Sequence, residues 1–125
     1  MSKFVIRTVP SGIKFDLKAP NGEIIATSEV YTTELACQKG IASVRKNAPA
    51  AALENQTEEG YRPQRNPKFE LFQDKAGKFR FRLKATNGHV IAISEDYATK
   101  SGCLNGIESV RKNAEEAEVL RSSSV

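Results

Sequence analysis

The sequence IKFDLKAPNGEIIATSEVYTTELACQKGIASVRKNA at residues 13–48 returns at residues 79–114 as FRFRLKATNGHVIAISEDYATKSGCLNGIESVRKNA. The two stretches align without a gap at an offset of 66, and 21 of the 36 positions are identical. Such self-similarity indicates that one structural unit occurs twice in the chain. A unit of about 60 residues has a marginal core when it folds alone. We therefore expect the two repeats to share one core.

Each repeat begins with the features of a three-stranded meander. Asn21-Gly22 and Asn87-Gly88 predict hairpin turns of type I′, in which both central residues have positive φ. Strand-like segments flank these turns, and each repeat has one further strand upstream. The expected strands are 3–9, 13–18 and 23–28 in repeat one and 68–73, 78–84 and 89–94 in repeat two. The third strand of each set has adjacent apolar residues, which indicates coverage on both faces, as in a central strand or in a strand at an interface.

The apolar period then changes to that of a helix. Apolar residues at 37, 41, 44 and 48, and again at 103, 107, 110 and 114, form one helical stripe that includes Cys37 and Cys103. Thr33 and Thr99 are predicted N-caps. Gly40 and Gly106 lie inside these helices, where glycine costs about 1 kcal/mol relative to alanine. That cost indicates a close approach by another helix or by the sheet, with a helix kink as the alternative.

A fourth strand is expected after each helix, at 51–54 and 117–120, which makes each repeat a β-β-β-α-β unit of an α+β protein. A polar segment with two prolines separates the repeats and is predicted to be a linker. We expect a single compact domain over 1–125, divided into repeat one (3–55), the linker (56–67), repeat two (68–121) and a disordered tail (122–125).

The repeated pattern Asn-Gly-x-x-Ile-x-x-Ser-Glu-x-Tyr-x-Thr, followed by Cys-x-x-Gly-Ile-x-Ser-Val-Arg-Lys-Asn-Ala, resembles the YegP-like family of small bacterial tandem-repeat proteins. Both copies match. The resemblance implies two units related by a pseudo-two-fold axis, with their last strands exchanged and their two helices packed together. It implies no activity, because the family is one of unknown function. Two departures stand out: Phe72 lacks a counterpart in repeat one, and Glu23 replaces His89.

Composition narrows the class of protein. The chain is 39% hydrophobic and 27% charged, with a net charge of +4, as in soluble globular proteins. No apolar run approaches the length of about 18–20 residues that spans a bilayer, and the N-terminal residues lack a signal-peptide core. We expect a cytoplasmic protein without membrane contact. A monomer is also expected, because tandem fusion places in one chain what a single-repeat relative would obtain by dimerising.

The sequence offers little catalytic chemistry. His89 is the single histidine, and it follows a turn where it is expected to be solvated. The cysteines are not in a CxxC pair, so we expect two buried thiols, with a disulfide between the repeats as the alternative. Glu29 and Glu95 precede the helix caps, and Tyr31 and Tyr97 are expected to pack at the strand-to-helix junction, with a ligand-facing position as the alternative. We therefore predict no metal, no cofactor and no enzyme activity.

The largest difference between the copies is a basic strand in repeat two. Its alternating cations are Lys78, Arg80, Arg82 and Lys84. Alternate residues share one face at a spacing of about 6.5–7 Å, which could follow a polyanion. A solvated face paired with Glu70 and Asp74 is the other interpretation. The sequence thus predicts a non-catalytic binding or accessory protein, with weak nucleic-acid binding through this strand as the alternative and an enzyme as the least supported class.

Overall fold

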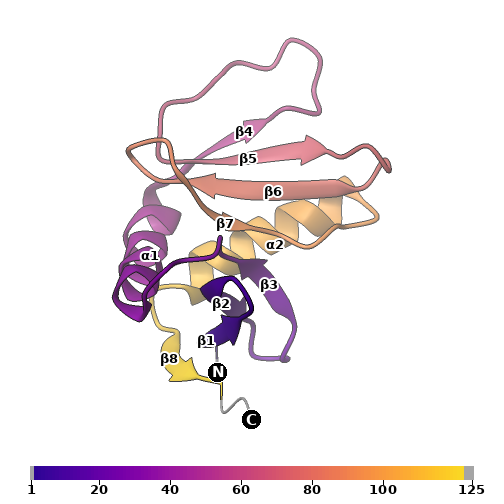
Figure 1. Cartoon of the computed structure of the whole chain (residues 1–125). Coiled ribbons are helices and arrows are strands. Elements are labelled where there is room, and N and C mark those ends of the chain that lie inside the picture. Colours follow the sequence, from indigo (N-terminus) through magenta and orange to yellow (C-terminus); the bar gives the residue numbers. More distant parts are fainter. Residues whose placement is uncertain (1, 123–125) are drawn as a thin grey trace.

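The computed structural model describes residues 2–122, which form one eight-stranded mixed sheet with two α-helices (Figure 1). The elements are β1 Lys3–Val9, β2 Gly12–Lys18, β3 Ile24–Thr27, α1 Glu34–Asn47, the 3-10 turn η1 Ala48–Ala50, β4 Ala52–Asn55, β5 Lys68–Gln73, β6 Phe79–Lys84, β7 Val90–Ile93, α2 Lys100–Asn113 and β8 Glu118–Arg121. Within the described residues, no helix is long and apolar enough to cross a membrane. The predicted disordered tail lies outside these residues, apart from Ser122.

The last strand of each repeat joins the other repeat. The strands lie across the sheet in the order β4-β5-β6-β7-β3-β2-β1-β8. β4 of repeat one pairs in parallel with β5 of repeat two, and β8 of repeat two pairs in parallel with β1 of repeat one. Figure 1 shows β4 and β8 at opposite ends of the sheet, each beside a strand from the other half of the chain. The expected exchange is confirmed, with both strands starting one residue later than predicted.

The two halves meet at the centre of the sheet. Thr27 of β3 pairs with Ile93 of β7, and these residues occupy equivalent positions at the offset of 66. β3 and β7 are the two central strands, as expected, but no helix covers their second face, where Thr27 and Ile93 are half-buried. Because equivalent residues face each other there, the halves are arranged as a pseudo-two-fold requires.

The Asn-Gly turns differ from the predicted type I′. Gly22 and Gly88 have positive φ, but no described residue other than glycine does, so Asn21 and Asn87 do not adopt the type I′ conformation. The N–H of Gly22 donates to the carbonyl of Ala19 at 2.9 Å, and Ala19 pairs with Glu23 beyond the turn. These contacts describe a three-residue loop with a glycine bulge. The asparagine instead accepts a hydrogen bond from the N–H two residues later.

The helices begin as predicted and contact the sheet. The hydroxyl oxygens of Thr33 and Thr99 accept hydrogen bonds from first-turn N–H groups. α1 packs on β2 and β7, whereas α2 packs on β6, β5 and β3, so each helix reaches a strand of the other repeat. The close approach expected at the interior glycines comes from the sheet and its flanking tyrosine, not from the other helix, and the expected packing of the two helices together is not among the main contacts of the described residues. A β-carbon at Gly40 would meet Tyr31 and Phe15, which belong to the same repeat.

One continuous core lies between the helices and one face of the sheet. Its largest fully buried side chains include Phe4, Phe15, Phe69 and Phe81. Phe15, Phe69 and Phe81 alternate along their strands with charged neighbours that point to the other face, and Phe4 lies between Lys3 and Val5. That second face has no helix against it.

Candidate functional site

We call the second face of the sheet the uncovered face. Strand pairing places eight cations and four carboxylates on it, a surplus of four positive charges that equals the net charge of the whole chain. The cations are Lys3, Arg7, Lys14, Lys18, Lys68, Arg80, Arg82 and Lys84, and the acids are Asp16, Glu54, Glu70 and Glu118. Asp16, Glu54 and Glu70 are each 3% exposed. The face therefore presents mostly positive charge to solvent.

In repeat two, most of these charges are neutralised by buried acids. Glu70 forms ion pairs with Arg82 at 2.5 Å, Lys68 at 3.2 Å and Lys84 at 3.3 Å. Lys68 also pairs with Glu54 at 2.7 Å, which joins β5 to the exchanged strand β4. Burial would raise the pKa of Glu70, but its basic neighbours outweigh burial and lower that pKa. The network therefore keeps both carboxylates charged beneath the cations.

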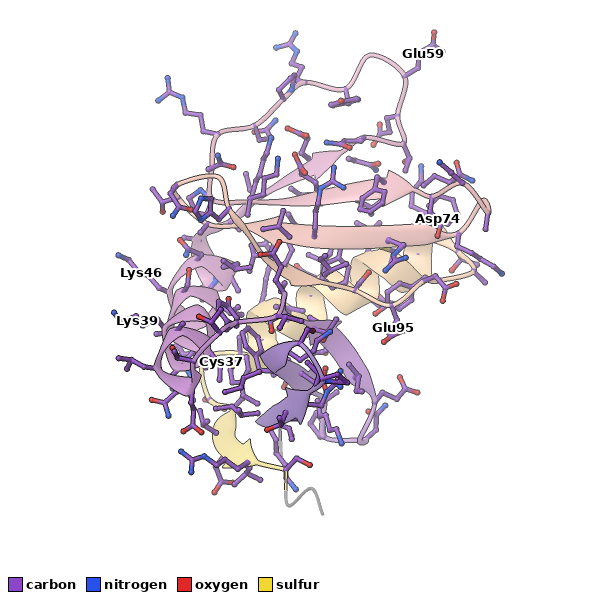
Figure 2. The ribbon with its side chains drawn as sticks, viewed as in Figure 1. Cys37, Lys39, Lys46, Glu59, Asp74 and Glu95 are labelled. Atoms are coloured by element: carbon purple, nitrogen blue, oxygen red, sulfur yellow. The ribbon has the colours of Figure 1, made fainter. Side chains whose placement is uncertain are left out.

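The carboxylate of Glu54 receives further donors from the linker. The side chain of Gln56 and the backbone N–H of Gln64 both donate to it, at 2.6 and 2.7 Å. Burial alone would raise the pKa of Glu54. The hydrogen bonds from Lys68, Gln56 and Gln64 overcome that effect and lower the pKa to about 2. The linker is thus anchored to the uncovered face at Glu54, while Figure 2 shows Glu59 at the outer end of the linker loop.

Repeat one neutralises less of its charge. Arg7 pairs with Asp16 at 2.7 Å, and Asp16 stands at the position that Arg82 occupies in repeat two. Val5 stands at the position of Glu70, so this half lacks the acid that gathers three cations. Among residues 2–122, no carboxylate lies within salt-bridge distance of Lys3, Lys14 or Lys18. Apart from Arg80, the cations of the uncovered face without a carboxylate partner among the described residues therefore lie in repeat one.

The four cations singled out in the sequence have different environments. Arg82 and Lys84 are held by Glu70, as the pairing interpretation expected, and Arg80 donates to the carbonyl of Ser94 at 3.1 Å. Lys78 is exposed beside the turn before β6. The guanidinium of Arg82 lies over the ring of Phe72, 4.4 Å from its centroid. That ring is therefore covered rather than presented for stacking with a base.

Asp74 takes no part in this network. Its carboxylate accepts hydrogen bonds from the N–H groups of Ala76 and Lys78 within its own turn, each at 2.9 Å.

The other candidate residues serve the fold. Cys37 and Cys103 are fully buried free thiols, which confirms the burial and leaves the alternative disulfide unformed. Burial raises the pKa of both, that of Cys103 to about 11. Burial likewise raises the pKa of Tyr31 and Tyr97. Thiolate and phenolate forms are thus disfavoured at neutral pH.

The remaining predicted residues lie at the surface. His89 is exposed after its turn, and Glu29 and Glu95 are exposed between the third strand and the helix of their repeats. Within residues 2–122, no three His, Cys, Asp or Glu side chains are grouped so that they could hold a metal ion.

Sequence reasoning missed the role of Arg45 and Arg111, which lie in the last turns of α1 and α2. Arg45 donates to the carbonyl of Ala117, directly before the exchanged strand β8. Arg111 donates to the carbonyl of Ala48 in repeat one at 3.2 Å and lies over Phe69, 4.9 Å from the ring centroid. Each arginine thus ties its helix to the other repeat. Their presence in both copies was a signal, but the carbonyl partners could not be identified before the exchange was known.

These features define a class of small α+β proteins in which two tandem β-β-β-α-β units complete each other's sheet. The chain belongs to the family described as a domain of unknown function, DUF1508, whose family model matches residues 12–54 and 74–120. This family includes the YegP proteins, so the resemblance seen in the sequence is confirmed.

Relatives of full and half length are known. The UPF0339 protein YegP of Escherichia coli K12 is 41% identical over 100 residues, which cover 80% of this chain and 77% of that protein. A UPF0339 protein of Treponema denticola is 66% identical over 53 residues, which cover 42% of this chain and 91% of that protein. The solution structure of yegP from E. coli, a protein of unknown function, matches with a TM-score of 0.79 at 36% identity, covering 99% of this chain and 96% of that one.

Proposed function

We propose that the protein is a non-catalytic binding protein of the bacterial cytoplasm, and that the uncovered face of its sheet is the binding surface. The observation that carries this proposal is the distribution of charge on that face: three buried carboxylates lie beneath a layer of cations. The buried acids fix the paired side chains, and the surplus cations remain available to a partner. An acidic macromolecule is the partner that such a face attracts.

Several features support a binding role over a catalytic one. The thiols are buried with raised pKa values, and the phenols also have raised pKa values. A nucleophile needs the opposite shift, toward its ionised form at neutral pH. The residues that are identical in the two repeats serve as helix caps, turn residues or packed core side chains.

The unneutralised lysines indicate where on this face the partner binds. Lys14 and Lys18 lie on the same face of β2, four residues apart. Each step of two residues advances about 7 Å along the strand. Lys3 lies directly opposite Lys18 on β1. These three cations form one patch in repeat one, and we infer that contact with an acidic partner is centred there.

The test is a fluorescence-polarisation titration at low salt with a labelled polyglutamate peptide. We expect Lys14→Glu/Lys18→Glu to remove most of the binding. The control, Lys100→Glu/Lys112→Glu, makes the same change in net charge on α2 and should bind like the parent. Equal binding by the parent and both variants, or no binding by the parent, would contradict the proposal.

Nucleic acid is a second candidate, favoured by the row of cations on adjacent strands of the same face. Contact would be with the phosphate backbone, because Arg82 covers Phe72. If Lys3, Lys14, Lys18 and Arg80 each contact a phosphate of a single strand, the slope of log K against log salt should be about −3. A labelled single-stranded oligonucleotide in the same titration checks this. Loss of oligonucleotide binding in Arg80→Gln/Arg82→Gln but not in Lys14→Glu/Lys18→Glu would assign it to β6 instead.

A further inference from the structure

A groove lies between α1 of repeat one and the β6–β7 turn of repeat two, on the opposite side of the sheet from the uncovered face. Its volume is about 430 Å³. The lining residues are Lys39, Ala42, Ser43, Lys46, Asn47, Ala85, Thr86 and Asn87. This lining holds two lysines and no carboxylate. The groove is therefore a separate positive site, formed only where the two repeats meet.

The two lysines are spaced to converge on one ligand. Lys39 and Lys46 are seven residues apart on α1, which is about two turns or 10.5 Å along the helix axis. Figure 2 shows both side chains on the same outer side of α1. Ala42 and Ser43 lie between them and have small side chains, so the space between the ammonium groups stays open.

The far end of the groove is fixed by hydrogen bonds. Asn47 is buried; its amide nitrogen donates to the carbonyl and hydroxyl oxygens of Ser43, and its oxygen accepts from the hydroxyl of Thr86 at 3.2 Å. The side-chain oxygen of Asn87 accepts from the N–H of His89 at 3.0 Å, which leaves its amide nitrogen as a donor. A ligand in the groove would thus meet two ammonium groups and an amide donor on a rigid wall.

The second repeat offers an internal comparison. At the equivalent positions around α2 and the β2–β3 turn, Asn105 replaces Lys39, Glu108 replaces Ala42 and Glu116 replaces Ala50. Pro20 replaces Thr86, which removes a hydroxyl and an N–H. The cavity there is about 200 Å³ and is lined by Ser2, Pro20, Asn113 and Glu116. The same fold thus exists with one lysine and two carboxylates, so it does not require the positive groove.

We propose that the groove between α1 and the β6–β7 turn binds a small ligand that carries a phosphate or diphosphate group, at one site per chain. The groove is shallow and open to solvent, so its two ammonium groups are accessible to a charged ligand. Lysine ammonium groups bind phosphate as point charges with several donors each. The carboxylate of Glu116, which lines the equivalent cavity, would repel such a ligand, so the second cavity stays empty of it.

The test is an NMR titration of amide shifts in the full chain with inorganic pyrophosphate at low ionic strength. We expect saturable shifts at Thr86, Asn87 and the adjoining face of α1, with one equivalent bound. Lys39→Gln/Lys46→Gln should weaken the affinity by about tenfold or more, the scale of losing hydrogen bonds to a charged group. Lys112→Gln, the matched change at the position equivalent to Lys46, should leave the affinity unchanged.

Four results would each overturn the proposal. The first is equal shifts at the turns 20–22 and 86–88, and the second is equal weakening by Lys112→Gln. The third is a linear response without saturation, and the fourth is a set of shifts concentrated on the lysines of β2. Because Lys14 and Lys18 lie on the other side of the sheet, loss of polyglutamate binding and loss of pyrophosphate binding would be separate outcomes.

Discussion

The hydroxyl of Tyr31 lies where the side chain of any other residue at position 40 would begin. A β-carbon at Gly40 would be 2.2 Å from that hydroxyl oxygen and 3.2 Å from Cε2 of Phe15. Repeat two has the same arrangement, with Tyr97 and Phe81 around Gly106. Tyr31 also stacks on Phe15, with ring centroids 6.4 Å apart. The unfavourable helix propensity of the glycine is therefore offset by aromatic packing that needs the missing β-carbon.

We expect Gly40→Ala to destabilise the protein by about 1–3 kcal/mol, because overpacking outweighs the gain in helix propensity. Urea unfolding would measure the change. Tyr31→Phe in the same background removes the nearest atom and should recover part of the loss. An alanine variant as stable as the parent would show that Tyr31 moves aside at no cost.

The buried carboxylate of Glu54 makes stability depend on pH. Its pKa is about 2 in the folded protein and 4.5 as the ordinary value. Because folding lowers the pKa of Glu54, its charged carboxylate stabilises the folded protein at any pH above the ordinary pKa. That stabilisation is lost as the pH falls from about 4.5 toward 2. The contribution is up to about 3 kcal/mol. Urea unfolding across this range should show a shallower loss for Glu54→Gln than for the parent, whereas the exposed Glu108→Gln should follow the parent.

At the scale of the elements, local patterns predicted most of the fold. The alternation in β6, the helical stripes and the caps at Thr33 and Thr99 each depend on neighbours in sequence, and each was confirmed. The turn type failed because Asn-Gly also suits a three-residue loop, in which the asparagine side chain bonds the backbone instead of adopting positive φ. The strand exchange came from the family resemblance, since a short apolar strand does not specify its partner.

The candidate surfaces were harder to predict than the elements. The basic row on β6 was visible in the sequence, but its neutralisation depends on register, which places Glu70 opposite Arg82. Glu54 reaches the same network only because β4 crosses to the other repeat. The groove beside α1 likewise joins residues 39–47 with residues 85–87, which no local pattern connects.

The connection between each helix and the other repeat can be tested at Arg111. Arg111→Lys keeps the charge but loses the planar guanidinium that bonds the Ala48 carbonyl and covers Phe69. We expect a loss of about 1–2 kcal/mol of unfolding free energy. The neighbouring Lys112→Ala, which is exposed, should change stability little. If both variants unfold like the parent, the arginine does not hold the repeats together.

For the whole molecule, the exchanged strands mean that neither repeat completes its own sheet. The T. denticola relative is about as long as one repeat. In the arrangement seen here, a single unit would need a second copy to supply its parallel partner strand. We expect residues 66–122 of this chain, expressed alone, to form a dimer in which β8 pairs with β5 of the other copy, as β4 does here. Thermal unfolding of that fragment should depend on concentration, because folding and association are then one step. The full chain should sediment as a monomer and unfold independently of concentration. A folded, monomeric fragment would mean that β8 can turn back onto its own repeat, and that the exchange follows from the linker rather than from the repeat itself.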